Sequence, residues 1–176
     1  MPRNEKRLDA FTTAYVEAAL WSSTDNADDS GGDPLDANYS ASDIAPATLE
    51  AMKRDCADFQ SKYGSLIEDD DSSAIDKWGR WELAGHDFWL TRNGHGAWVG
   101  DGNFPKHDDE LSEAAESYGN FDLYVGDDGV IYAMGHEEAL SEARSPSRRH
   151  TVRDFSSIDD LVDHARQQDG ATHALV

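Results

Sequence analysis

An Asn-Gly dipeptide at positions 93–94 is the feature that most constrains how this chain folds. It lies in the middle of the segment GHDFWLTRNGHGAWVGDG, residues 85–102, and apolar residues alternate on both sides of it. Asn-Gly in such a context is typical of a two-residue β-hairpin turn, because both positions of that turn take a positive φ. The segment therefore predicts a β-hairpin that turns at Asn93-Gly94.

The register of this predicted hairpin assigns its side chains to two faces, since successive side chains of a strand alternate. We expect one face to be apolar and buried. On the other face Trp89 lies opposite Trp98, and Arg92 faces His95 beside the turn. We predict that these four residues form a ligand-binding surface, where the indoles stack on a ring and the cations meet a phosphate or carboxylate. The alternative is that both indoles pack under a helix as part of the core.

The same segment contains residue types that serve in acid–base and phosphodiester chemistry. His86, Asp87 and Asp101 are secondary candidates for the site, because a histidine can move protons while a carboxylate orients it. A small hydrolase or nuclease is therefore one alternative function. No GxSxG elbow, Walker loop or HExxH helix accompanies these residues. Nothing in the sequence fixes a third metal ligand beside His86, so we assign no catalytic residue, metal or cofactor.

Acidic residues dominate the charge, with 36 Asp and Glu against 15 Lys and Arg and a formal net charge of −21. Such self-repulsion destabilises a compact chain at low salt, but at molar salt the screening length falls to about 3 Å. The charge therefore predicts a protein of an extreme halophile or its virus, located in the cytoplasm of a host cell with high internal salt. It argues against direct wrapping of DNA, and it leaves an acidic nucleic-acid mimic with an anti-defence role as another alternative.

The spacing of apolar residues predicts several helices and a second hairpin. Helical spacing predicts one helix over residues 8–22 and a longer one over 46–67, where Pro46 suits the first helical position. A short helix is expected to end at Gly119, and residues 121–134 predict strands joined by the turn at 127–129. The expected fold class is α+β, with a small antiparallel sheet built from two β-hairpins packed against several helices.

The length of 176 residues fits one domain. We expect an α+β domain over residues 1–143 with acidic loops at 23–42 and 68–76. An Arg-rich segment and a C-terminal helix, over 144–176, are expected to pack on the same domain. No apolar run reaches the ~18 residues of a membrane span, and the N-terminus lacks an apolar signal core. The single Cys56 falls on the apolar stripe of a predicted helix, so we expect a buried thiol.

Four phrases of the sequence carry a family resemblance: ALWSSTD (19–25), LDANYSASDIAPATLEAMKRDCADFQ (35–60), GHDFWLTRNGHGA (85–97) and DLYVGDDGVIY (122–132). They resemble an uncharacterised family of small proteins encoded by tailed bacteriophages, prophages and haloarchaeal viruses. The resemblance implies a virus or mobile element as genomic context, and it implies no activity. We therefore expect an accessory protein without catalysis that binds a small ring-bearing ligand or an unknown host or viral partner.

Overall fold

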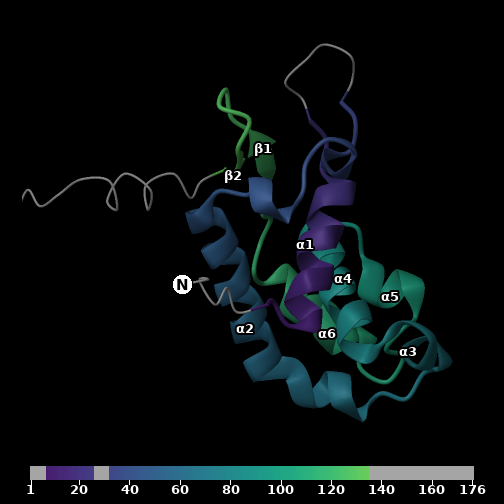
Figure 1. Ribbon diagram of the computed structural model, residues 1–176. Coiled ribbons are helices and arrows are strands. Elements are labelled where there is room, and N and C mark those ends of the chain that lie inside the picture. The colour runs from purple at the N-terminus through teal and green to yellow at the C-terminus, as the bar shows by residue number, and fades with distance from the viewer. Residues whose placement is uncertain (1–6, 26–31, 135–176) are drawn as a thin grey trace, which may run out of the picture. The chain divides into compact units, whose positions relative to one another are not determined.

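The computed structural model describes residues 7–25 and 32–134 of the chain. This part is mostly helical and contains one two-stranded antiparallel sheet (Figure 1). The expected α+β class is confirmed, but the sheet is built from one hairpin instead of two. No described helix has both the length and the apolar character needed to cross a membrane. The elements are α1 (Ala10–Ser22), η1 (Leu35–Ala37), η2 (Ala41–Asp43), α2 (Pro46–Asp69), α3 (Ser73–Trp78), α4 (Arg80–Arg92), α5 (Ala97–Asp101), α6 (Asp108–Glu116), β1 (Leu123–Val125) and β2 (Ile131–Ala133).

Helices α1 and α2 form where the apolar spacing predicted them. The N-cap of α1 is Asp9, whose side chain accepts a hydrogen bond from the backbone N–H of Thr12 at 2.8 Å. Pro46 begins α2, where its missing N–H costs no helical hydrogen bond. Cys56 is buried on the inner face of α2, as expected.

The centre of the core is the contact between α1 and α4, which lie side by side (Figure 1). Gly85 of α4 permits this close approach, because a Cβ at that position would overlap the backbone carbonyl of Phe11. Around the contact the aromatic rings pack directly, with the rings of Phe59 and Phe88 stacked at 4.2 Å between centroids. The long helix α2 contributes Phe59 and thus closes this core from a second side.

The predicted hairpin over residues 85–102 is wrong. The first half of the segment belongs to α4 and the second half to α5. Asn93 has φ −95° and caps α4, while Gly94 has φ +84°. The N–H of Gly94 donates to the carbonyl of Thr91 (3.0 Å), and that of His95 donates to the carbonyl of Leu90 (2.8 Å). These two bonds form a Schellman motif, in which a glycine with positive φ ends a helix instead of turning a hairpin.

The hairpin expected over residues 121–134 is confirmed. Strands β1 and β2 pair antiparallel, with Tyr124 opposite Tyr132 and their ring centroids 5.7 Å apart. Gly129 takes φ +75° in the turn between the strands. The N–H of Ala45 donates to the carbonyl of Ile131 at 2.8 Å, which ties the hairpin to the start of α2.

Two regions complete the comparison with the expected organisation. The acidic loop expected over 68–76 is shorter than predicted, because α2 extends to Asp69 and α3 begins at Ser73. Helix α6 ends at Glu116, and Gly119 takes φ +69° three residues later. The Arg-rich segment and the C-terminal helix expected over 144–176 lie outside the described residues.

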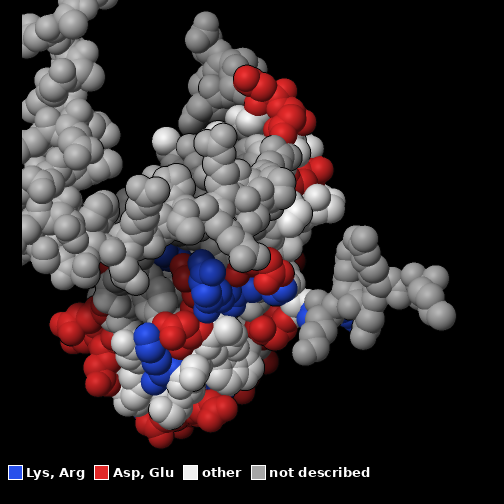
Figure 2. All heavy atoms as spheres, turned by 90° about the vertical axis from the view of Figure 1, so that its left-hand side faces the viewer, with Lys and Arg blue, Asp and Glu red and all other residues white. Residues whose placement is uncertain are grey.

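The surface on the α2 side of the molecule mixes charges of both signs. Figure 2 shows basic side chains on this face lying among more numerous acidic ones. Two ion pairs join residues that are one turn apart on α2. Lys53 pairs with Glu50 at 2.6 Å, and Lys62 pairs with Asp58 at 2.7 Å. Since each pair joins a largely exposed side chain to a partly exposed one, each contributes little to stability.

Candidate functional site

A cleft of about 750 Å³ lies between α1, α3, α4 and α5. Its volume is within the range of roughly 300–1,000 Å³ that is usual for small-molecule sites. We call it the acidic cleft, because its described lining includes three carboxylates and neither lysine nor arginine. The residues that line the acidic cleft are Ala14, Glu17, Ala18, Trp21, Ala74, Trp78, Glu82, Leu83, His86, Gly100, Asp101 and Asn103.

Two exposed tryptophans give the acidic cleft its apolar surface. Trp21, from the end of α1, is 45% exposed, and Trp78, from the end of α3, is 63% exposed. The ring of Trp21 stacks on the imidazole of His86, with 5.8 Å between centroids and 22° between planes. Lys77 holds its Nζ 4.8 Å from the ring centre of Trp78. These indoles leave large apolar surface in solvent that a bound molecule would cover.

His86 and Asp87, adjacent on α4, form the ionisable centre of the site. Nδ1 of His86 lies 3.2 Å from Oδ1 of Asp87, and Oδ2 of Asp87 accepts a hydrogen bond from the Asn103 amide at 3.1 Å. Asp87 is fully buried, and burial raises the pKa of its carboxyl group against the opposing effect of these two hydrogen bonds. The hydrogen bond with Asp87 raises the pKa of His86 in turn. Both shifts favour retention of a proton between the two side chains.

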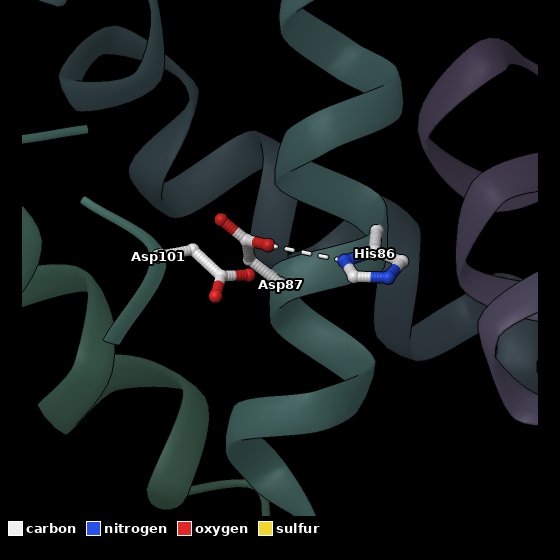
Figure 3. Close-up of side chains that lie close together, drawn as sticks. All are labelled: His86, Asp87 and Asp101. Carbon is white, nitrogen blue, oxygen red and sulfur yellow. Dashed lines mark hydrogen bonds and ion pairs between the residues drawn. The ribbon is translucent and has the colours of Figure 1, made fainter. Parts of the chain in front are cut away.

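Asp101 brings a second carboxylate to this pair from α5. Ligand atoms of His86, Asp87 and Asp101 all lie within 4.8 Å of one another. Figure 3 shows His86 and Asp87 on the same helix and the carboxylate of Asp101 next to that of Asp87. The next residue, Gly102, ends α5 with φ +62°, and this reversal brings Asn103 to Asp87. The three secondary candidates from the sequence therefore lie together.

The four primary candidates do not form the exposed surface that the hairpin predicted. Trp89, Arg92 and Trp98 are exposed by only 2%, 4% and 0%, whereas His95 is exposed. The physical reason is the helical backbone, which directs positions 88, 89 and 92 of α4 inward instead of alternating them between two faces. Both indoles belong to the core, which was the alternative interpretation.

Arg92 is a structural centre of the core. Its guanidinium donates to the hydroxyl of Tyr15 at 2.7 Å, to the carboxylate of Asp55 at 2.9 Å, and to the carbonyls of Gly119 at 2.8 Å and Tyr118 at 3.1 Å. The indole N–H of Trp89 donates to the hydroxyl of Ser22 at 2.8 Å.

His95 and Trp89 both line a second, smaller hollow of about 360 Å³ next to the β-hairpin. Neither Arg92 nor Trp98 lines it, so this hollow contains only two of the four residues that were predicted to form one surface.

The sequence analysis missed the two tryptophans of the acidic cleft. Trp78 is the last residue of α3, a helix whose first part lies within the loop expected over 68–76. Trp21 continues a helical row that includes Ala14 and Ala18, and all three line the cleft. Small residues next to an indole on one helix face were a signal that space is left beside the ring.

Comparison with known proteins adds no assignment. No family model, no curated protein and no solved structure matches this chain. The functional argument therefore depends on the geometry of the acidic cleft.

Proposed function

We propose that this protein acts by binding, and that the acidic cleft takes a small ring-bearing ligand. The observation that carries the proposal is the pair of exposed indoles, Trp21 and Trp78, in a cleft large enough for such a ligand. Aromatic side chains offer flat apolar surface to a ring, and stacking of one ring on another contributes about 1–3 kcal/mol. The proposed binding site is therefore the acidic cleft, and not the surface of Trp89, Arg92, His95 and Trp98 that the sequence predicted.

The charge of the cleft favours neutral or positively charged rings. Glu17, Glu82 and Asp101 are exposed at the cleft, and its described lining contains neither Lys nor Arg. Lys77 lies over the ring of Trp78 but does not line the cleft. An anionic ring would meet this negative potential, whereas a cation is attracted both by the carboxylates and by the faces of the indoles. The ligand class that suits the site best is an organic cation with a flat ring.

The biological setting that we infer comes from the sequence. The family resemblance supports an accessory protein of a virus or mobile element, and the net charge of −21 supports a host with high internal salt. In that setting the natural ligand is either a small molecule of the host or a ring-bearing group on a host or viral partner.

Three pyridine compounds of similar size test both the location and the charge preference. 1-Methylnicotinamide is cationic, nicotinamide is neutral and nicotinate is anionic. In 1 M KCl, where long-range fields are screened, we expect affinity for the full-length protein to fall in that order, measured by quenching of tryptophan fluorescence and by thermal stabilisation. Contact with the indoles, which screening affects less, would preserve the order.

Single substitutions test whether these compounds bind in the acidic cleft. We expect Trp78→Ala to weaken the binding of 1-methylnicotinamide at least about fivefold, equivalent to about 1 kcal/mol, through loss of one cation–π contact. Val99→Ala is the matched control, because Val99 is 54% exposed near the site but does not line the cleft. Unchanged affinity in Trp78→Ala and Trp21→Ala would rule out the acidic cleft as the binding site.

One observation favours acid–base catalysis as a second candidate function. The imidazole of His86 lines the cleft and is held by a buried carboxylate, an arrangement that orients a histidine as a general base. A small hydrolase is the form of this candidate that the sequence analysis raised. Hydrolysis of bis(p-nitrophenyl) phosphate that is lost in His86→Gln would support it, and absence of turnover in the wild type would exclude this substrate.

A further inference from the structure

We propose that His86, Asp87 and Asp101 bind a divalent transition-metal ion at the edge of the acidic cleft. One imidazole and two carboxylates are ligands that such ions use in proteins. The three ligand atoms lie within 4.8 Å of one another although they come from two separate helices. Two of the three residues, His86 and Asp101, line the cleft, so an ion held there is accessible from it.

The spacing of the His86 and Asp87 ligand atoms fits direct coordination. Metal–nitrogen and metal–oxygen bonds of about 2.0–2.2 Å separate neighbouring ligand atoms by about 2.8–3.6 Å in octahedral or tetrahedral geometry. Nδ1 of His86 and Oδ1 of Asp87 are 3.2 Å apart, which is within that interval. The third ligand atom lies within 4.8 Å of the other two, and Asp101, exposed at the end of α5, would have to change rotamer to bring its carboxylate to the same ion.

Electrostatics also favours a cation at this point. Asp87 is fully buried beside a second carboxylate, an arrangement that is costly unless a proton or a cation neutralises it. Among the described residues His86 is the only one in an ion pair with Asp87, and no salt bridge there involves Asp101. A dication would balance both aspartates while leaving the histidine neutral.

The surrounding structure orients the proposed ligands. The amide of Asn103 donates to Oδ2 of Asp87, which leaves Oδ1 directed to His86. The backbone carbonyl of Asn103 in turn accepts a hydrogen bond from the hydroxyl of Ser72, before α3. Hydrogen bonds of this kind hold metal-binding carboxylates in position and raise affinity.

The donor set selects among metals. Carboxylate oxygens alone suit Mg²⁺ and Ca²⁺, but the imidazole nitrogen shifts preference toward Mn²⁺ and Zn²⁺. Zn²⁺ and Mn²⁺ are therefore the expected ions, and Mg²⁺ serves as the comparison.

Calorimetric titration of the metal-stripped full-length protein tests the site. In 1 M KCl, which screens diffuse attraction to exposed carboxylates, we expect one Mn²⁺ or Zn²⁺ per chain and weaker binding of Mg²⁺. Asp101→Asn should lower the affinity at least about tenfold. Because Asp101 is exposed at the end of a short helix, this variant is expected to unfold at the wild-type temperature without metal.

Two controls make the result specific. Glu82→Gln removes a carboxylate from the same cleft but not from the proposed ligand set, and Asp76→Asn removes an exposed one from α3. Both should bind metal as the wild type does, while His86→Gln should lose the preference for Mn²⁺ and Zn²⁺ over Mg²⁺. Wild-type affinity in Asp101→Asn, or the absence of a one-to-one site in the wild type, would overturn the proposal.

These titrations contain no ring compound, so their outcome is separate from that of the proposed function. If the pyridines bind in the presence of a chelator and no metal site is found, only the metal proposal fails. If a metal binds and no pyridine does, only the ring-binding proposal fails.

Discussion

Arg92 shows how strongly the role of a residue depends on the element that carries it. On a strand beside a turn it would be a free cation for a ligand, whereas on α4 its side chain is only 3% exposed and is shared by four acceptors. Its guanidinium also lies 5.1 Å from the ring centre of Phe121. The planar fork of donors that recognises a phosphate is used here to connect α1, α2 and the segment after α6.

Replacement of this residue should be strongly destabilising. We expect Arg92→Met to lower the free energy of unfolding by about 3 kcal/mol or more, because it leaves Asp55 and several buried acceptors without their donor. Arg54→Met, at an exposed position of α2, is the control and should change it by less than about 0.5 kcal/mol. Denaturant titration of both variants in the same salt measures the difference. Similar losses in the two variants would contradict the structural role of Arg92.

His86, Asp87 and Asp101 were predicted as secondary candidates from their residue types alone. They do lie together in the structure, but not because they belong to a hairpin. Counted outward from a turn at Asn93-Gly94, the predicted register places His86 across from Asp101 on paired strands. In the structure the two residues come together because α5 packs against α4. The sequence could indicate which residues carry chemistry, because few residue types can transfer protons or bind metals. The sequence could not indicate the cleft, because Trp21 and Trp78, which line it, belong to helices that are far apart in the sequence.

At the scale of elements, the spacing of apolar residues predicted the long helices better than the short ones. Helix α2 has a continuous apolar stripe along its length and was predicted nearly to the residue. Residues 85–102 include the second half of α4 and all of α5, which are shorter helices. The apolar residues of this segment match both the alternation of a strand and the spacing of a helix. Asn93-Gly94 did not decide between them, since a positive φ at the glycine serves a hairpin turn and a helix end equally.

Because α1 packs closely on α4, alanine substitution is expected to affect stability differently at two glycines of the chain. Gly85→Ala should lower the free energy of unfolding by about 1–3 kcal/mol, because its methyl group would force α4 away from the backbone of Phe11. Gly100→Ala, in α5, meets no atom within 4 Å and should be neutral or stabilising by up to about 1 kcal/mol. Thermal unfolding of the two variants provides the comparison. A stable Gly85→Ala would mean that the helices do not approach so closely.

For the whole molecule, the balance between charge and packing sets the conditions under which the fold is stable. The aromatic core of α1, α2 and α4 is compact, but the chain carries a net charge of −21. Exposed acidic groups repel one another over distances that depend on the salt concentration, whereas burial of the core depends on salt much less. Stability at low salt is therefore limited by the surface and not by the core.

This balance predicts a strong salt dependence. Between about 0.1 and 2 M KCl we expect a stability gain on the order of 3 kcal/mol, which corresponds to a rise of roughly 6–12 °C in Tm for a chain of this size. Substitution of Glu68, Glu113 and Glu116 by Gln removes three exposed charges near helix C-termini, where the helix dipole also opposes them. The triple variant should be more stable than the wild type at the lower salt concentration and equal to it at the higher one. If it gains the same stability at both concentrations, charge repulsion is not the cause, because only an electrostatic effect disappears with screening.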